Sequence, residues 1–197
     1  MGTRILAALA IIGGAMLEVG LVFTLALVAG APDGTFGTVD YNAPQYVASM
    51  LVYMGAVVTL SIALWGLIFR FQDRVRGGVA MVGVLGGFGG MLSAMGAYAL
   101  LPLLVVGSAA VTLELSRIGA MSRSVAIVHT VAALAFLVID VAALVNWSTF
   151  ANSPVAALGV LVLPYPLTWI GIGVALLRGQ PASDRPNPSP GASGGAF

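Results

Sequence analysis

Hydrophobic residues occur along this chain in long continuous runs, and the polar residues collect in the shorter segments between them. Apolar runs of about 18 residues or more are typical of membrane-spanning helices. Such runs are clear at about residues 5–29, 46–69, 124–147 and 155–177. The pattern predicts an all-α integral membrane protein without a soluble domain.

The apolar stretch from residue 78 to residue 121 allows two interpretations, because it is long for one helix and short for two. In the first, the chain turns at the segment Tyr-Ala-Leu-Leu-Pro, and two spans lie at about 78–97 and 103–121. In the second, one long span reaches about residue 106 and is followed by a segment at the membrane interface. The first interpretation gives six transmembrane helices in three hairpins, and the alternative gives five.

The positions of the arginines favour six spans. Arginine and lysine in short loops prefer the cytoplasmic side of a membrane. With six spans and a cytoplasmic N-terminus, all the basic residues lie on that side, whereas five spans divide them equally between the two sides. These residues are Arg4, Arg70, Arg74, Arg76, Arg117, Arg123, Arg178 and Arg185. We therefore expect a transmembrane domain over 1–178, a tail rich in proline, glycine and serine over 179–197, and both termini in the cytoplasm.

Composition agrees with a membrane location. Charged residues make up 8% of the chain, against about 25% in soluble domains, and the mean hydropathy is +1.05. The net charge of +1 offers no electrostatic surface for nucleic acid. The lack of cysteine excludes disulfides and thiolate catalysis. Lysine is absent while alanine, glycine and valine are abundant, a usage associated with GC-rich bacterial genomes, so we expect the bacterial cytoplasmic (inner) membrane.

Small residues recur at helical spacing in the third span. Gly83 and Gly87 form one small-xxx-small pattern, and Gly86 and Gly90 form a second that overlaps it. Such patterns let two helices approach at backbone distance within a membrane. They predict helix packing, either between helices of this chain or at an interface between subunits.

Pro164 and Pro166 flank Tyr165 within the last span. Each proline removes a backbone donor and bends or breaks a helix. The carbonyls released there need other partners at membrane depth. We expect either a kink that serves packing or a break that lines a cavity, the arrangement that transporters use for binding.

Glu18 lies near the centre of the first span. It follows Ala7, Ala10 and Gly14 at i, i+3 or i+4 spacing, so the carboxyl group belongs to a face of small residues that another helix can approach. An ionised carboxylate at that depth costs at least about 2.5–3.5 kcal/mol. We expect Glu18 to be mostly protonated and to donate a hydrogen bond to a neighbouring helix.

Three other ionisable residues lie within predicted spans: Glu114, His129 and Asp140. Glu114, placed near the middle of the fourth span, either pairs with Arg117 at i, i+3 or joins Glu18 and Asp140 in one depth band. His129 and Asp140 share a stripe of the fifth helix. Each residue has a structural interpretation, Asp140 as a helix-to-helix hydrogen bond and His129 as a core histidine. Together the four are also typical of a proton path.

No motif of catalysis, haem ligation, metal binding or phosphate binding accompanies these residues. We therefore expect no enzymatic activity and no cofactor within the chain, although lipid, quinone or pigment contacts could come from a larger complex. The first functional hypothesis is a non-catalytic accessory subunit that packs with other membrane proteins in the lipid bilayer. The alternative is a small proton-coupled transporter that uses the buried carboxylates.

Overall fold

A computed structural model describes residues 2–152 and 161–178, and these residues contain helices and no strand. The helices are α1 (Thr3–Ala29), α2 (Pro44–Arg70), α3 (Gly77–Ala94), α4 (Leu101–Arg117), α5 (Arg123–Val145), the short α6 (Trp147–Ala151) and α8 (Pro164–Arg178). Two short 3-10 helices, η1 (Phe36–Thr38) and η2 (Tyr98–Leu100), lie in the connections. The expected tail over 179–197 lies outside the described residues.

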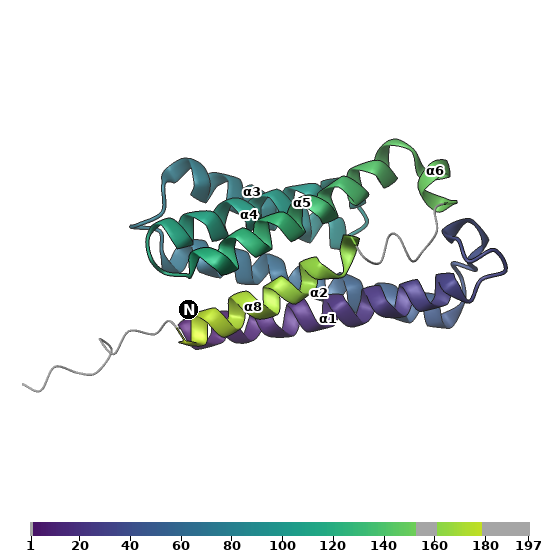
Figure 1. Cartoon of the computed structure of the whole chain (residues 1–197), viewed down its shortest axis with the longest axis horizontal. Coiled ribbons are helices and arrows are strands. Elements are labelled where there is room, and N and C mark those ends of the chain that lie inside the picture. The colour runs from purple at the N-terminus through teal and green to yellow at the C-terminus, as the bar shows by residue number, and fades with distance from the viewer. Residues whose placement is uncertain (1, 153–160, 179–197) are drawn as a thin grey trace, which may run out of the picture.

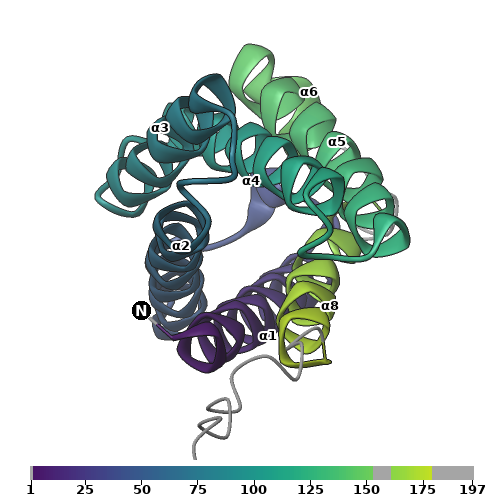
Figure 2. The ribbon, with the colours of Figure 1, turned by 90° about the vertical axis from the view of Figure 1, so that its left-hand side faces the viewer.

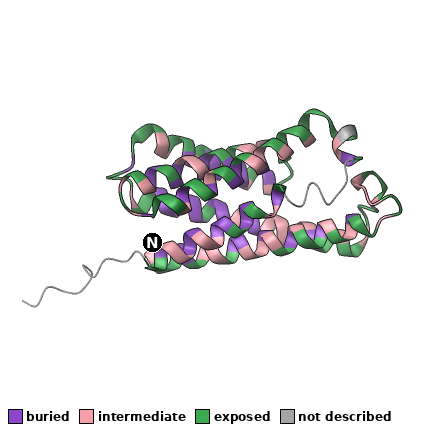
Figure 3. Cartoon of the chain, viewed as in Figure 1, coloured by how far each residue is buried: buried purple, intermediate pink, exposed green. Residues whose placement is uncertain are grey.

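Six of the helices form a closed ring in which each helix packs against the next. The order is α1, α2, α3, α4, α5 and α8, and α8 packs back against α1 (Figures 1 and 2). The α5–α8 junction is the least extensive of the six. The inward faces are buried and most outward faces are exposed (Figure 3). The largest inward side chains include Trp169, Tyr165 and Leu64, so the ring encloses a packed core.

Five helices are long and apolar enough to cross a membrane: α1, α2, α3, α4 with its leading turn, and α5. Large apolar side chains cover their outward faces, for example Leu51, Met81 and Val131 at 62–65% exposure. Such a surface would be unfavourable in water and is what lipid requires. These features indicate a multi-pass membrane protein.

The stretch between residues 78 and 121 forms two helices. The α3 helix ends in a Schellman motif, in which the Gly96 amide donates to Ser93 and the Ala97 amide donates to Leu92. The φ of Gly96 is +105°, a conformation that side chains with a Cβ disfavour. The α4 helix then begins at Leu101, with Pro102 in its first turn. The long single span of the five-span alternative is therefore wrong.

Both helices are shorter than their predicted spans of 78–97 and 103–121. The α4 helix also ends in a Schellman motif, with Gly119 at a φ of +73° and the Ala120 amide donating to the Leu115 carbonyl. Apolar residues continue beyond the C-terminal ends of both helices. Hydropathy alone therefore placed these two helix ends several residues beyond their positions in the structure.

The glycines of α3 pack against helices of the same chain. A Cβ on Gly86 would lie 2.7 Å from the Leu103 carbonyl and 3.0 Å from the Gly107 Cα, both in α4. A Cβ on Gly87 would collide with the Trp65 ring, and one on Gly90 with the Ser61 hydroxyl. Both contacts lie on α2, and Gly83 fits between α2 and α4 in the same way. The interpretation as packing within the chain is confirmed.

All the arginines of the described residues lie at one end of the ring. Arg74 donates to the Ile118 carbonyl at 2.6 Å, which brings the α2–α3 and α4–α5 connections together. Arg178 and Gly119 line one cavity, so α8 ends beside the same connections. Arg4, at the start of α1, lies at this end too, because Gly173 of α8 meets Ala7. We call it the arginine end, and the loop with Asp33 and Asp40 lies at the opposite end (Figure 1).

The expected break in the last predicted span is present. Leu161 and Val162 are helical, Leu163 forms a turn, and α8 begins at Pro164. Proline suits the first turn of a helix, where its missing N–H has no partner to lose. Part of the predicted span 155–177, residues 155–160, lies outside the described residues.

Candidate functional site

His129 lies at the centre of a buried polar cluster that joins three helices. Its Nδ1 is 2.7 Å from the Thr168 hydroxyl of α8, and its Nε2 is 3.1 Å from the Ser108 hydroxyl of α4. Ser108 also lies 3.0 Å from the Tyr165 hydroxyl. The Tyr165 and Trp169 rings pack against the imidazole. We call these residues the His129 cluster.

Both ring nitrogens of His129 lie within hydrogen-bond distance of a hydroxyl group, and each hydroxyl also has a backbone carbonyl as acceptor. Thr168 donates its hydroxyl proton to the Tyr165 carbonyl at 2.6 Å, so it accepts the Nδ1–H of His129. The Ser108 hydroxyl, which is the partner of Nε2 at 3.1 Å, likewise donates to a backbone carbonyl, that of Val105, at 2.9 Å. His129 is 0% exposed, and both ring nitrogens have partners. His129 therefore lies in the core between two hydroxyl partners, as its structural interpretation predicts.

Glu114 is held by two arginines at the arginine end. Arg117 binds both carboxylate oxygens, at 2.9 and 2.7 Å, and Arg76 binds them from the α2–α3 connection, the closest pair at 2.7 Å. The Arg76 backbone amide adds a further bond at 3.0 Å. The Glu114 side chain is 1% exposed, whereas the arginines remain 67% and 51% exposed. A carboxylate held by two guanidinium groups is ionised, so Glu114 ties α4 to the α2–α3 connection.

The predicted position of Glu114 near the middle of the fourth span is wrong, and its predicted pair with Arg117 is correct. The α4 helix ends at Arg117, less than one turn beyond Glu114. The Schellman motif at Gly119 ends the helix there, so Glu114 does not share a mid-helix depth band with Glu18 and Asp140.

Asp140 lies beside a cavity of about 130 Å³ at the opposite end of the ring. Its Oδ2 is buried and has no hydrogen-bond partner among the described residues. The cavity walls come from α1, η1, α5, α6 and the short helical segment before the break. They are mainly apolar, with Leu21, Leu25, Phe36, Phe136, Phe150 and Val162 around the carboxyl group. We call this space the Asp140 cavity.

Glu18 lies between the Asp140 cavity and the start of α8. On the same stripe of α1, Gly14 contacts the Pro166 carbonyl and Leu21 lines the Asp140 cavity. The side chain is partly exposed, and its buried Oε2 has no hydrogen-bond partner among the described residues. The hydrogen bond expected from Glu18 to a neighbouring helix is therefore not seen at this atom.

The four ionisable residues thus occupy separate environments. His129 is buried in the core with a hydroxyl partner at each ring nitrogen, and Glu114 is paired with two arginines at the arginine end. Glu18 and Asp140 each have one buried carboxyl oxygen without a partner among the described residues. The stripe expected on α5 runs through buried Ala133 and Phe136 to Asp140. No group of three or more histidine or acidic residues among the described residues could hold a metal ion.

Sequence reasoning missed the partners of these residues. Ser108 and Thr168 lie 21 and 39 residues from His129, and Arg76 lies 38 residues from Glu114. The one local signal was the Pro-Tyr-Pro segment, which places Tyr165 at the break. Comparison with known proteins found no matching family model, no matching curated protein and no matching solved structure.

Proposed function

We propose that this protein is a non-catalytic, multi-pass membrane subunit that packs within a larger assembly in the bacterial inner membrane. The observation that carries the proposal is the distribution of unpaired polar atoms. His129 and Glu114 each have hydrogen-bond or ion-pair partners within the fold, and this pairing supports a structural role for both. The buried carboxyl oxygens without a partner are confined to Glu18 and Asp140 among the described residues.

The outward face of α5 is the surface we assign to a partner. This helix is the least buried of the five long ones. Val131, Leu134 and Val138 follow one another at i, i+3 and i+4 spacing, with exposures of 62%, 55% and 64%. Lipid can also cover such a face, so the proposal needs a test that separates lipid from protein.

Site-specific photo-crosslinking makes that separation. A photoreactive amino acid is placed at Val131, and a control is placed at Met81, which is 65% exposed on α3. Irradiation of intact cells should convert the Val131 variant to one discrete band heavier than the 20.0 kDa chain, with a second polypeptide identified in it, while the Met81 variant gives none. Lipid adducts alone at both positions would contradict the assignment of this face.

A second candidate is a small proton-coupled transporter, and one specific observation favours it. The Asp140 cavity lies beside a break in the last span, and Val162 immediately before that break lines it. Broken helices beside a buried acidic residue are typical of transport sites. The filled core around Trp169 and Tyr165 argues against an open path through the ring.

Proton flux decides between the candidates. Proteoliposomes with wild type and with Asp140→Asn are compared under an imposed pH gradient. The subunit proposal predicts equal rates that match empty liposomes. Flux in wild type that disappears in Asp140→Asn, with the variant folded and inserted normally, would establish the transporter instead.

A further inference from the structure

A groove runs along the α5–α8 junction from the arginine end to the helix break. Two cavities make up this groove, one of about 690 Å³ and one of about 430 Å³. Val125 of α5 and Gly171 of α8 line both, so the two spaces adjoin. Pockets that hold small ligands are typically about 300–1,000 Å³. We call the combined space the α5–α8 groove.

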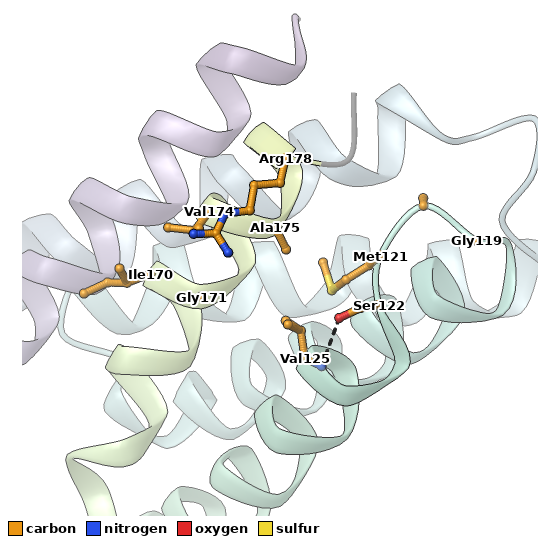
Figure 4. A pocket seen from close by; sticks show the side chains of 10 residues that line it. Gly119, Met121, Ser122, Val125, Ile170, Gly171, Val174, Ala175 and Arg178 are labelled. Atoms are coloured by element: carbon orange, nitrogen blue, oxygen red, sulfur yellow. Dashed lines mark hydrogen bonds between the residues drawn. The ribbon is translucent and has the colours of Figure 1, made fainter. Parts of the chain in front are cut away.

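The larger cavity is the more polar part of the groove and forms its mouth. It opens at the arginine end, between the α4–α5 connection and the last turns of α8. Figure 4 shows Arg178 reaching back along α8 over this cavity, opposite Ser122. Arg178 is exposed and has no ion-pair partner among the described residues. The mouth therefore presents a free positive charge and a hydroxyl group at the predicted level of the membrane surface.

The smaller cavity is apolar and continues toward the middle of the ring. Val128 and Leu167 line it, and Pro164 closes its far end. Gly171 also lines it, and a Cβ at this position would point into open space with no atom within 4 Å. From Arg178 to Pro164 the groove follows 14 residues of helix, which is about 21 Å at a rise of about 1.5 Å per residue. One leaflet of a bilayer has a hydrocarbon depth of about 15 Å.

We propose that the α5–α8 groove holds one phospholipid with an anionic headgroup, taken from the leaflet at the arginine end. The phosphate lies at Arg178, and an acyl chain lies over Gly171 toward Pro164. Charge complementarity at the mouth selects an anionic headgroup over a zwitterionic one. The length of the groove fits a headgroup followed by a chain that spans one leaflet. A lipid at this position also fills the weakest junction of the ring and covers the α8 backbone at Gly171.

Lipid binding can be measured directly by native mass spectrometry of the purified, delipidated full chain. Phosphatidylglycerol or phosphatidylcholine is added back, and bound lipid is counted per chain. We expect one phosphatidylglycerol to bind at least tenfold more tightly than phosphatidylcholine. Equal binding of both lipids, or binding of many copies without saturation at one, would overturn the proposal.

Two variants test the two parts of the groove separately. Gly171→Phe places a ring in open space and should abolish phosphatidylglycerol binding while the chain stays folded. Its control is Gly78→Phe on α3, where an added Cβ also meets no atom within 4 Å. Arg178→Gln should keep lipid binding and lose the preference for the anionic headgroup. Arg70→Gln, an exposed arginine outside the groove, serves as its control.

Two further experiments test whether a soluble anion or the segment 179–197 occupies the α5–α8 groove instead of a lipid. Glycerol 3-phosphate, the headgroup chemistry without a chain, should not compete at concentrations that saturate the lipid. Competition would show a soluble anion site and contradict the lipid proposal. A chain that ends at residue 178 should bind phosphatidylglycerol as the full chain does. If only the shortened chain binds, the segment 179–197 occupies the groove and the proposal fails.

Discussion

At the scale of single residues, Glu18 and Asp140 differ from Glu114 in how their carboxyl oxygens are paired. Five hydrogen bonds from the side chains of two arginines hold the Glu114 carboxylate in place. Glu18 Oε2 and Asp140 Oδ2 are buried without such partners in the described residues. A buried polar atom without a partner costs about 1–3 kcal/mol. Among the described residues, the fold bears this cost at these two carboxyl oxygens and at Trp169 Nε1.

Replacing Glu18 with an apolar residue should therefore stabilise the isolated chain. Glu18→Leu removes the unpaired oxygen and keeps a similar volume, so we expect a gain of up to about 1–3 kcal/mol in the free energy of unfolding. The measurement is thermal unfolding in detergent. Val19→Leu, at a 61% exposed position on the same helix, is the control and should be silent. A lower melting temperature for Glu18→Leu would mean that the carboxyl group has a partner within the folded chain.

The ion pairs of Glu114 predict which single substitution at this site destabilises the protein most. Glu114→Gln removes the shared anion and leaves Arg76 and Arg117 without a counter-charge. Arg76→Ala removes one of two cations and leaves the other in place. We expect Glu114→Gln to lower the melting temperature more than either single arginine substitution does. An arginine variant that is as unstable as Glu114→Gln would show that the two cations are not redundant.

At the scale of elements, the tight packing of α3 follows from its glycines. Gly87→Leu places a side chain where the Trp65 ring lies, so we expect a loss of about 1–3 kcal/mol in unfolding free energy from overpacking. Gly78→Leu introduces the same residue on the same helix in open space and should cost nothing. Thermal unfolding of both variants, side by side with wild type, gives the comparison. If Gly87→Leu unfolds like Gly78→Leu, the α2–α3 contact is not as close as described.

Hydropathy predicted those helices that coincide with long apolar runs of the sequence. The long apolar runs located α1, α2 and α5 to within about two residues at their starts, and the proline pair located the break before α8. The ends of α3 and α4 could not be placed by hydropathy, because apolar residues continue past the Schellman motifs at Gly96 and Gly119. Those glycines were the local signal that would have placed both ends.

The site was less predictable than the helices. The Glu114–Arg117 pair is local and could be anticipated from its spacing, whereas Arg76 reaches Glu114 only because α3 and α4 fold back as a hairpin. The partners of His129 come from α4 and α8 for the same reason. The sequence identified the ionisable residues within the predicted spans, and tertiary structure decided which of them have partners.

At the scale of the whole molecule, the closed ring divides charge between its two ends. The arginines of the described residues gather at one end, and Asp33 and Asp40 lie at the other. Because arginine prefers the cytoplasmic side of a membrane, we propose that the arginine end of the ring faces the cytoplasm. Hydropathy alone could not predict that α8 closes the ring against α1, since that contact depends on Gly14 and Gly173.

Cysteine labelling in intact cells tests this orientation, because the chain has no native cysteine. We expect an impermeant maleimide to label Thr38→Cys, in the connection between α1 and α2, and to leave Asp73→Cys unlabelled until the cells are opened. Ser193→Cys, outside the described residues, should behave like Asp73→Cys. Labelling of Asp73→Cys from outside would reverse the orientation, and labelling of Ser193→Cys alongside Thr38→Cys would contradict an even number of crossings.

The central claim is that this chain works as a subunit of a larger membrane assembly. Its most direct test is the mass of the native particle, extracted from the source membrane in polymer-bounded lipid discs and measured by native mass spectrometry. The proposal predicts a particle in which the 20.0 kDa chain is bound to at least one different polypeptide in fixed ratio. A particle that contains only this chain and lipid, as a monomer or a homo-oligomer, would contradict it.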